Sequence, residues 1–168
     1  MPPFCILARH FGNNKIINTE RTDSMIEKDT IRLLRECDAG VKMGVSSIED
    51  TMEFRLSEPL KKVLDHSKAQ HMEMSREIAR RLDRFGDDGK DPPMIAEVMG
   101  SIKANFKLVT KETDSAAAEF ITDGCNMGIK SLSKYLNQYA AAEEYSKDIT
   151  KKLISIEEQL SADMRAFL

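Results

Sequence analysis

Residues 38–48 read DAGVKMGVSSI, and a closely similar stretch, TDGCNMGIKSL, returns 84 residues later as residues 122–132. Each copy carries two glycines four positions apart, inside a pattern that is otherwise helical. They are Gly40, Gly44, Gly124 and Gly128. A glycine inside a helix costs about 1 kcal/mol relative to alanine. Because this cost recurs at matched places, we expect the glycines to be helix-packing residues that let another backbone or a bulky side chain approach closely.

Apolar residues recur in steps of three and four on either side of both stretches, which is the pattern of amphipathic helices. Ser24, Ser57 and Thr113 stand where three of these helices would begin, and each can cap a helix through its hydroxyl. The run 86–93, GDDGKDPP, is the strongest stop signal in the chain. The spacing therefore predicts five helices and no strand, with the helices at about 25–54, 60–85, 92–109, 115–139 and 145–167.

The repeated glycines group the long helices into two hairpins, 25–85 and 115–167. The crossover between them, residues 86–113, contains the short helix and could travel the length of a bundle at roughly 1.5 Å per residue. Two hairpins joined by one long crossover form the ferritin-like topology. We therefore predict an all-α, ferritin-like four-helix bundle over residues 24–168, preceded by a loose N-terminal extension over residues 1–23.

Composition limits the possible partners. The net charge is −3, and basic residues are interleaved with acidic ones, so no nucleic-acid partner is expected. The Gly-x-x-x-Gly spacing is similar to that of membrane helix dimers, but Lys42 and Asn126 lie inside it and no apolar run reaches 18 residues. We therefore expect no membrane span.

The cysteines indicate a reducing environment. Cys5, Cys37 and Cys125 are odd in number and show no Cys-x-x-Cys spacing, so neither a disulfide framework nor a zinc site is expected. Cys37 and Cys125 fall on apolar helix stripes and should pack as small hydrophobic residues. A cytoplasmic location follows as a prediction.

Three segments carry a resemblance to a known family. They are residues 37–44, CDAGVKMG, the turn that includes Asp87 and Lys90–Pro92, and residues 123–128, DGCNMG. They resemble an uncharacterised bacterial four-helix-bundle family of the ferritin-like superfamily. The resemblance covers about residues 29–168 and lies in the pattern and order of the helices. It implies a ferritin-like fold and no assigned activity.

A ferritin-like di-metal centre would need a Glu from each of two helices and a Glu-x-x-His motif from each of the other two. None of the three histidines has a Glu three positions upstream. They are His10, His66 and His71, and the residues at that position are Leu7, Val63 and Lys68. We therefore predict that the bundle lacks a di-metal centre and that the protein needs no cofactor.

A degenerate metal site is the alternative, provided that the helix register brings its ligands together. Its candidate ligands are Asp38 or Glu36, His71, Asp123 and Glu157. The structural interpretation of His71 is an imidazole at the edge of the core with a hydrogen-bond partner. For Asp38 and Asp123 it is an acid on the solvent edge of a helix. We favour the structural interpretation of all three residues.

No sequence motif indicates catalysis. The chain contains no Gly-x-Ser-x-Gly, P-loop or Rossmann glycine pattern. We therefore expect a non-catalytic bundle that acts by binding another protein or itself, most simply as a homodimer. Val63 beside Leu64 and Ile154 beside Leu153 widen the apolar stripes and indicate an exposed apolar surface. The alternative is a metal-binding or redox ferritin-like protein with an atypical carboxylate and histidine site.

Overall fold

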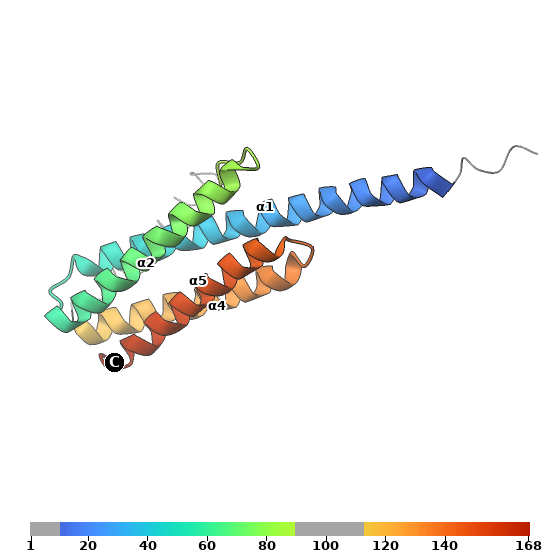
Figure 1. The fold of residues 1–168 in the computed structure, drawn as a ribbon. Helices are drawn as coiled ribbons and strands as arrows, with labels where there is room; N and C mark the ends of the chain where they lie inside the picture. The colour runs from blue at the N-terminus through green and yellow to red at the C-terminus, as the bar shows by residue number, and fades with distance from the viewer. Residues whose placement is uncertain (1–10, 90–112) are drawn as a thin grey trace, which may run out of the picture.

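The computed structural model describes residues 11–89 and 113–168. Within these ranges the chain forms helices and no strand (Figure 1). The helices are α1 (Phe11–Met52), α2 (Glu58–Asp83), α4 (Asp114–Gln138) and α5 (Glu144–Met164). The predicted all-α, four-helix architecture is confirmed. The short helix expected at 92–109 lies outside the described residues.

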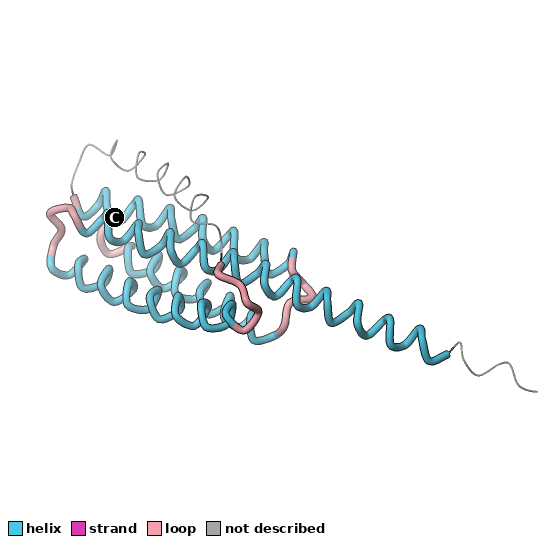
Figure 2. Tube along the Cα trace, turned by 90° about the horizontal axis from the view of Figure 1, so that it is seen from above, coloured by secondary structure: helices cyan, strands magenta, loops and turns pink. Residues whose placement is uncertain are grey.

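Two core clusters show how the helices run relative to one another. The first joins the C-terminal parts of α1 and α5 to the N-terminal parts of α2 and α4, and includes Ile48, Leu60, Ala117 and Met164. The second joins the middle of α1 to the opposite ends of the other helices, and includes Leu34, Leu82, Leu132 and Ile149. Therefore α1 runs antiparallel to α2 and α4 and parallel to α5. Figure 2 shows the helices lying side by side along a common direction.

The helix starts at Ser57 and Thr113 follow the expected capping chemistry. The Ser57 hydroxyl accepts a hydrogen bond from the backbone N–H of Leu60, and the Thr113 hydroxyl accepts one from Ala116. The two starts lie at the same end of the bundle, where the Ser57 N–H donates to Asp114 Oδ1 at 2.9 Å. The end of α2 and the start of α4 therefore lie at opposite ends of the bundle.

The expected start of the first helix near Met25 is wrong, because α1 begins at Phe11. Part of the segment expected to be a loose extension is therefore helical, and Ser24 lies within the helix instead of capping it. No Gly or Pro interrupts the chain between Asn13 and Ala39. A helix held by packing in the bundle can therefore extend backwards, since each added residue gains one hydrogen bond without a new nucleation cost.

The first part of α1 continues past the rest of the bundle (Figure 1). Helix α1 leaves the bundle where it contacts the turn between α4 and α5. There the Thr30 hydroxyl accepts a hydrogen bond from the Glu143 N–H at 2.9 Å. Asp29 accepts another from the Ala141 N–H at 3.3 Å. These two contacts fix α1 against the second hairpin at the end of the bundle where α5 begins.

The predicted stop after α2 is confirmed, and the turn there is joined to α1. Gly86 and Gly89 adopt φ values of +64° and +89°, which side-chain-bearing residues rarely adopt. Asp87 forms an ion pair with Arg35 at 2.7 Å and accepts the Gly89 N–H at 2.9 Å. The hydrogen bond from Arg35 lowers the pKa of Asp87 below its usual value.

The wider apolar stripes serve the core of this chain. Val63 is half-buried and packs against the first core cluster, and Ile154 is half-buried and packs against the second. The expectation that they form an exposed apolar surface is therefore wrong. Partial burial within the chain therefore accounts for the extra apolar positions. Fully buried leucines of the same helices, such as Leu60 and Leu153, each stabilise the fold by about 1.5–3 kcal/mol.

Candidate functional site

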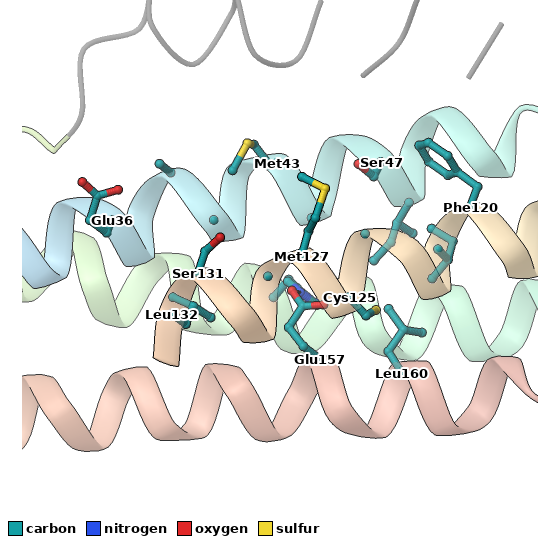
Figure 3. A pocket seen from close by; sticks show the side chains of 18 of the residues that line it. Glu36, Met43, Ser47, Phe120, Cys125, Met127, Ser131, Leu132, Glu157 and Leu160 are labelled. Atoms are coloured by element: carbon teal, nitrogen blue, oxygen red, sulfur yellow. Dashed lines mark hydrogen bonds and ion pairs between the residues drawn. The ribbon is translucent and has the colours of Figure 1, made fainter. Parts of the chain in front are cut away.

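A cavity of about 280 Å³ lies between α1 and α4, and all four repeated glycines line it (Figure 3). Met43 and Met127, which occupy matched positions in the two repeats, also line it. Two polar side chains, His71 of α2 and Glu157 of α5, reach the cavity from the opposite layer of the bundle. All four described helices therefore contribute to one site.

Among the described residues, the expected close approach of another backbone or a bulky side chain is not seen at Gly40 and Gly124. A Cβ atom added to either residue would meet no atom of residues 11–89 and 113–168 within 4 Å. Both glycines face open space in the cavity, so the missing side chains leave room there. The sequence showed that these positions are unusual, but it could not show whether the space beside them is filled.

Gly44 and Gly128 have a different role, because side chains of the opposite layer occupy the space beside them. A Cβ on Gly44 would lie 2.9 Å from His71 Cδ2 and 3.0 Å from His71 Nε2. A Cβ on Gly128 would lie 3.5 Å from Glu157 Cδ, which is an ordinary van der Waals distance. Gly44 therefore makes room for the imidazole, whereas the position of Gly128 could accept a methyl group.

His71 and Glu157 form a buried pair beneath these glycines. The His71 side chain is fully buried, and its Nε2 lies 3.0 Å from Glu157 Oε1. Its Nδ1 lies 2.9 Å from the Ser67 carbonyl oxygen. Because a carbonyl can only accept, Nδ1 carries a proton and donates it to Ser67. His71 thus has the hydrogen-bond partners expected of a core imidazole, and its Nε2 is held against a carboxyl group.

The pair favours the charged form of the imidazole. Burial alone would lower the pKa of His71, but the hydrogen bond and charge of Glu157, helped by the Ser67 carbonyl, outweigh burial and raise it above the usual value. Nε2–H then donates to the Glu157 carboxylate, and both ring N–H groups are satisfied. The result is an ion pair inside the bundle, in contact with the cavity.

We expect stability to fall with increasing pH because of this pair. A histidine whose pKa is higher in the folded state than in the unfolded chain stabilises the fold fully below its unfolded pKa of about 6.5. That contribution is lost as the pH rises through the folded-state pKa. Urea unfolding at a series of pH values from 5 upward measures the decline, and the double variant His71→Leu/Glu157→Leu should lack it. Equal pH profiles for the two proteins would contradict the ion pair.

Cys125 is the third side chain of this group. It is buried, and burial together with the charge of Glu157 and a hydrogen bond to it raises the pKa of the Cys125 thiol. Cys37 is also buried, in contact with Thr150 Oγ1 at 3.2 Å, and burial raises its pKa to about 12. Both thiols are free and stay protonated at neutral pH, as expected for cysteines that pack as hydrophobic residues.

These thiols should be unreactive in the folded protein. In a Cys5→Ser variant, which removes the remaining cysteine, we expect Cys37 and Cys125 to react with a disulfide reagent at pH 8 at least tenfold more slowly than in urea-unfolded protein, because thiolate and access are both lacking. The time course of released thiolate measures the rate. Rapid reaction of one equivalent in the folded state would show that the cavity exposes Cys125.

The candidate metal ligands are only partly brought together. His71 and Glu157 meet, whereas Asp38 is bound to Lys42 at 2.7 Å and Asp123 is exposed on α4. Asp38 is only 4% exposed, so the expectation of a solvent-edge acid is wrong for Asp38. Within residues 11–89 and 113–168, no three His, Cys, Asp or Glu side chains are placed to hold a metal ion together.

Two features of the site were missed in the sequence. One is the cavity itself, whose signal was the pair of matched glycines. The other is the approach of Glu36 of α1 to Tyr135 of α4, both of which line the cavity, where burial and the charge of Glu36 raise the pKa of the Tyr135 hydroxyl. No motif connects these two residues, because they lie on different hairpins and meet only when α1 and α4 pack together.

None of the helices in the described ranges has both the length and the apolar character needed to cross a bilayer. Comparison with other proteins adds no assignment. No protein-family model, curated protein or solved structure matches this chain.

Proposed function

We propose that this protein is a non-catalytic ferritin-like bundle that binds a small, mostly apolar ligand in the cavity between α1 and α4. The observation that carries this proposal is the space that the described helices leave open beside Gly40 and Gly124. Alanine would fit at both positions and would favour each helix by about 1 kcal/mol. A cavity kept open at matched places, against helix propensity, is what a ligand site requires.

The composition of the cavity wall agrees with a binding site. Small-molecule sites are concave, mostly apolar and carry a few polar groups that orient the ligand. Here Ile48, Phe120 and Leu160 supply apolar surface, while His71 and Glu157 supply buried polar atoms. The His71–Glu157 pair is already satisfied internally, and burial raises the pKa of the neighbouring Cys125 thiol so that it stays protonated; both features favour binding over chemistry.

Filling the cavity tests the proposal. We expect octan-1-ol, a neutral apolar probe, to bind the full chain saturably at one site by isothermal titration calorimetry. Gly40→Leu should weaken binding at least tenfold, because the new side chain enters the space that the probe needs. The control is Ala79→Leu, which adds the same side chain at an exposed position of α2. Binding that is absent, or equal in both variants, would refute the proposal.

The ferritin-like assignment is itself a proposal, and the helix directions support it. In this topology two antiparallel hairpins are joined by one long crossover. Here α2 ends at one end of the bundle and α4 begins at the other, where Ser57 and Asp114 meet. We further propose that an approximate twofold axis between the antiparallel helices α1 and α4 relates Gly44 to Gly128. An experimental structure in which the two hairpins superpose tests it.

Self-association, most simply as a homodimer, is a second candidate function. It is favoured by the N-terminal part of α1, which continues beyond its contacts with Ala141 and Glu143. A single helix in water is marginal without tertiary packing, and a second copy could supply that packing. Sedimentation equilibrium of the full chain at micromolar concentration should report a dimer, and a monomer at all concentrations would exclude this candidate.

A metal or redox function is the alternative to a simple binding role. The buried His71–Glu157 pair favours it, because imidazole and carboxylate are common ligands of iron and manganese. Elemental analysis of protein purified without added metal distinguishes the two functions. Iron or manganese at one or two equivalents per chain, lost in a Glu157→Leu variant, would replace the ligand-binding proposal with a metal site.

A further inference from the structure

We infer that the ligand of the cavity between α1 and α4 is a neutral amphiphile, an apolar chain with one hydroxyl group, and that this hydroxyl donates a hydrogen bond to the Glu157 carboxylate. The inference rests on the proposed function, because it assigns a ligand class to the same cavity. The juxtaposition that carries it is a buried carboxylate that lies against two glycines of the cavity wall, Gly44 and Gly128.

Gly44 and Gly128 leave the Glu157 carboxylate uncovered on the cavity side. A Cβ atom on Gly44 would lie 3.7 Å from Glu157 Oε1, and a Cβ atom on Gly128 would lie 3.6 Å from the same oxygen. The glycines belong to α1 and α4, whereas Glu157 rises toward them from α5, as Figure 3 shows. Because neither glycine carries a side chain that would cover this carboxylate, Glu157 forms part of the cavity wall.

The buried pair offers a ligand an acceptor and no donor. Both ring N–H groups of His71 are used, by the Ser67 carbonyl at 2.9 Å and by Glu157 Oε1 at 3.0 Å. A carboxylate can accept roughly four hydrogen bonds. The bond from His71, even with a weak one from the neighbouring Cys125 thiol, therefore leaves capacity on Glu157. A ligand that meets this pair must donate a hydrogen bond to use it.

The charges of the pair favour a neutral ligand. The His71 imidazolium faces Glu157 directly, so the two charges balance within the wall. A ligand carboxylate would lie against Glu157, and like charges in contact disfavour binding strongly. A ligand ammonium would have to lose its own water beside a carboxylate that already has a cationic partner. A hydroxyl supplies the proton without adding a buried charge.

The burial of Glu157 makes the ligand's donor important. Glu157 is only 7% exposed, so the cavity side is where a further donor can reach the carboxylate. A ligand that fills the cavity without an O–H or N–H group would shield the carboxylate from water and give it no hydrogen bond in return. Buried charged acceptors tolerate such a loss poorly, so a site of this kind discriminates strongly between ligands with and without a donor.

The position of Gly44 along the cavity sets the length of the ligand. The cavity wall follows α1 from Glu36 to Ile48, and Gly44 lies eight residues from Glu36 and four from Ile48. At 1.5 Å per residue these steps are about 12 Å and 6 Å. The longer arm passes Gly40, where the described helices leave space open. A hydroxyl beside Gly44 therefore leaves room for an extended chain of about eight carbons.

The test compares octan-1-ol with 1-methoxyheptane, an ether of the same formula that lacks the O–H group, and with octanoate. Each is titrated into the full chain at pH 7 by isothermal titration calorimetry. We expect octan-1-ol to bind at least tenfold more tightly than the ether, because a hydrogen bond to a charged group contributes enough for such a factor. Octanoate should bind more weakly than octan-1-ol, because its carboxylate would face Glu157.

Two alanine variants, one helical turn apart on α4, locate the preference for the alcohol. Gly128→Ala places a methyl group 3.6 Å from Glu157 Oε1 and should reduce the ratio of the octan-1-ol and ether affinities at least threefold. The matched control is Gly124→Ala, which adds the same methyl group where no atom of the described residues lies within 4 Å. It should change both affinities by the same factor and preserve their ratio.

A double variant assigns the preference to the buried pair. His71→Leu/Glu157→Leu removes the acceptor and should bind octan-1-ol and 1-methoxyheptane with affinities within twofold of each other. Circular dichroism melts verify that each variant is folded. The alanine variants give an independent answer, because they leave both members of the pair in place.

Each outcome separates the inference from the proposed function. If octan-1-ol binds at the cavity and 1-methoxyheptane or octanoate binds as tightly, the inferred ligand class is overturned and the binding function stands. If the alcohol is preferred but the preference survives in Gly128→Ala or in the double variant, the assignment to Glu157 is overturned. If none of the three probes binds saturably, both the inference and the proposed function fail.

Discussion

Replacement of His71 by alanine is expected to lower the free energy of unfolding by about 3–5 kcal/mol, the usual effect of removing one partner of a buried ion pair. The imidazole is fully buried, and Glu157 is only 7% exposed. Without the ring, the Glu157 carboxylate would lie in the bundle without its cationic partner. The loss should therefore exceed the ordinary packing cost expected for a histidine at the edge of a core.

A double-mutant cycle identifies the source of this loss. His71→Leu/Glu157→Leu replaces the pair with apolar side chains and should be much more stable than either single variant, because buried pairs are often replaceable by hydrophobic residues. The control is His66→Ala on the same helix, at an exposed position, where we expect a change within about 0.5 kcal/mol. Urea unfolding measures His71→Ala, the single variants His71→Leu and Glu157→Leu, the double variant and the His66→Ala control. A loss below about 1 kcal/mol for His71→Ala would contradict the ion pair.

The second large effect is expected for Gly44→Leu, which should cost about 1–3 kcal/mol or more through overpacking. Even the first carbon of the new side chain would lie 2.9 Å from the His71 ring. The ring cannot easily retreat, because Ser67 and Glu157 hold its two nitrogens. Leucine is the better helix former, so the sign of the effect reports the contact and not helix propensity.

Alanine at the same glycines gives the sharper comparison. Gly44→Ala should destabilise the fold, whereas Gly40→Ala and Gly124→Ala should each gain up to about 1 kcal/mol, because no atom in the described part of the chain lies within 4 Å of the added carbon. At Gly128 the added carbon would be at an ordinary distance from Glu157, so this variant should also be neutral or stabilised. Denaturant melts measure the four changes. Destabilisation at Gly40 would show that the cavity wall is less open than the structure indicates.

The local features of the fold could be predicted from the sequence. Apolar spacing of three and four residues marked the helices, and Ser57 and Thr113 marked two of the helix starts, because a cap acts within one turn of its own chain. The start of α1 was missed for the same reason. Ser24 is a possible cap, but a capping residue permits a helix to begin without forcing it to. No Gly or Pro lies between Asn13 and Ser24 to end the helix there, and α1 extends back to Phe11.

The candidate site depended on tertiary structure. The sequence by itself determined that Gly40, Gly44, Gly124 and Gly128 are special, since glycine is unfavourable in a helix wherever it occurs. Only the packing of α1 against α4 and α2 decided that Gly40 and Gly124 face space left open by the described residues and that Gly44 accommodates an imidazole. The physical reason is that a helix pattern defines which face turns inward, whereas what occupies the opposite side depends on the rotation and register of other helices. His71 and Glu157 meet for that reason alone, across 86 residues of chain.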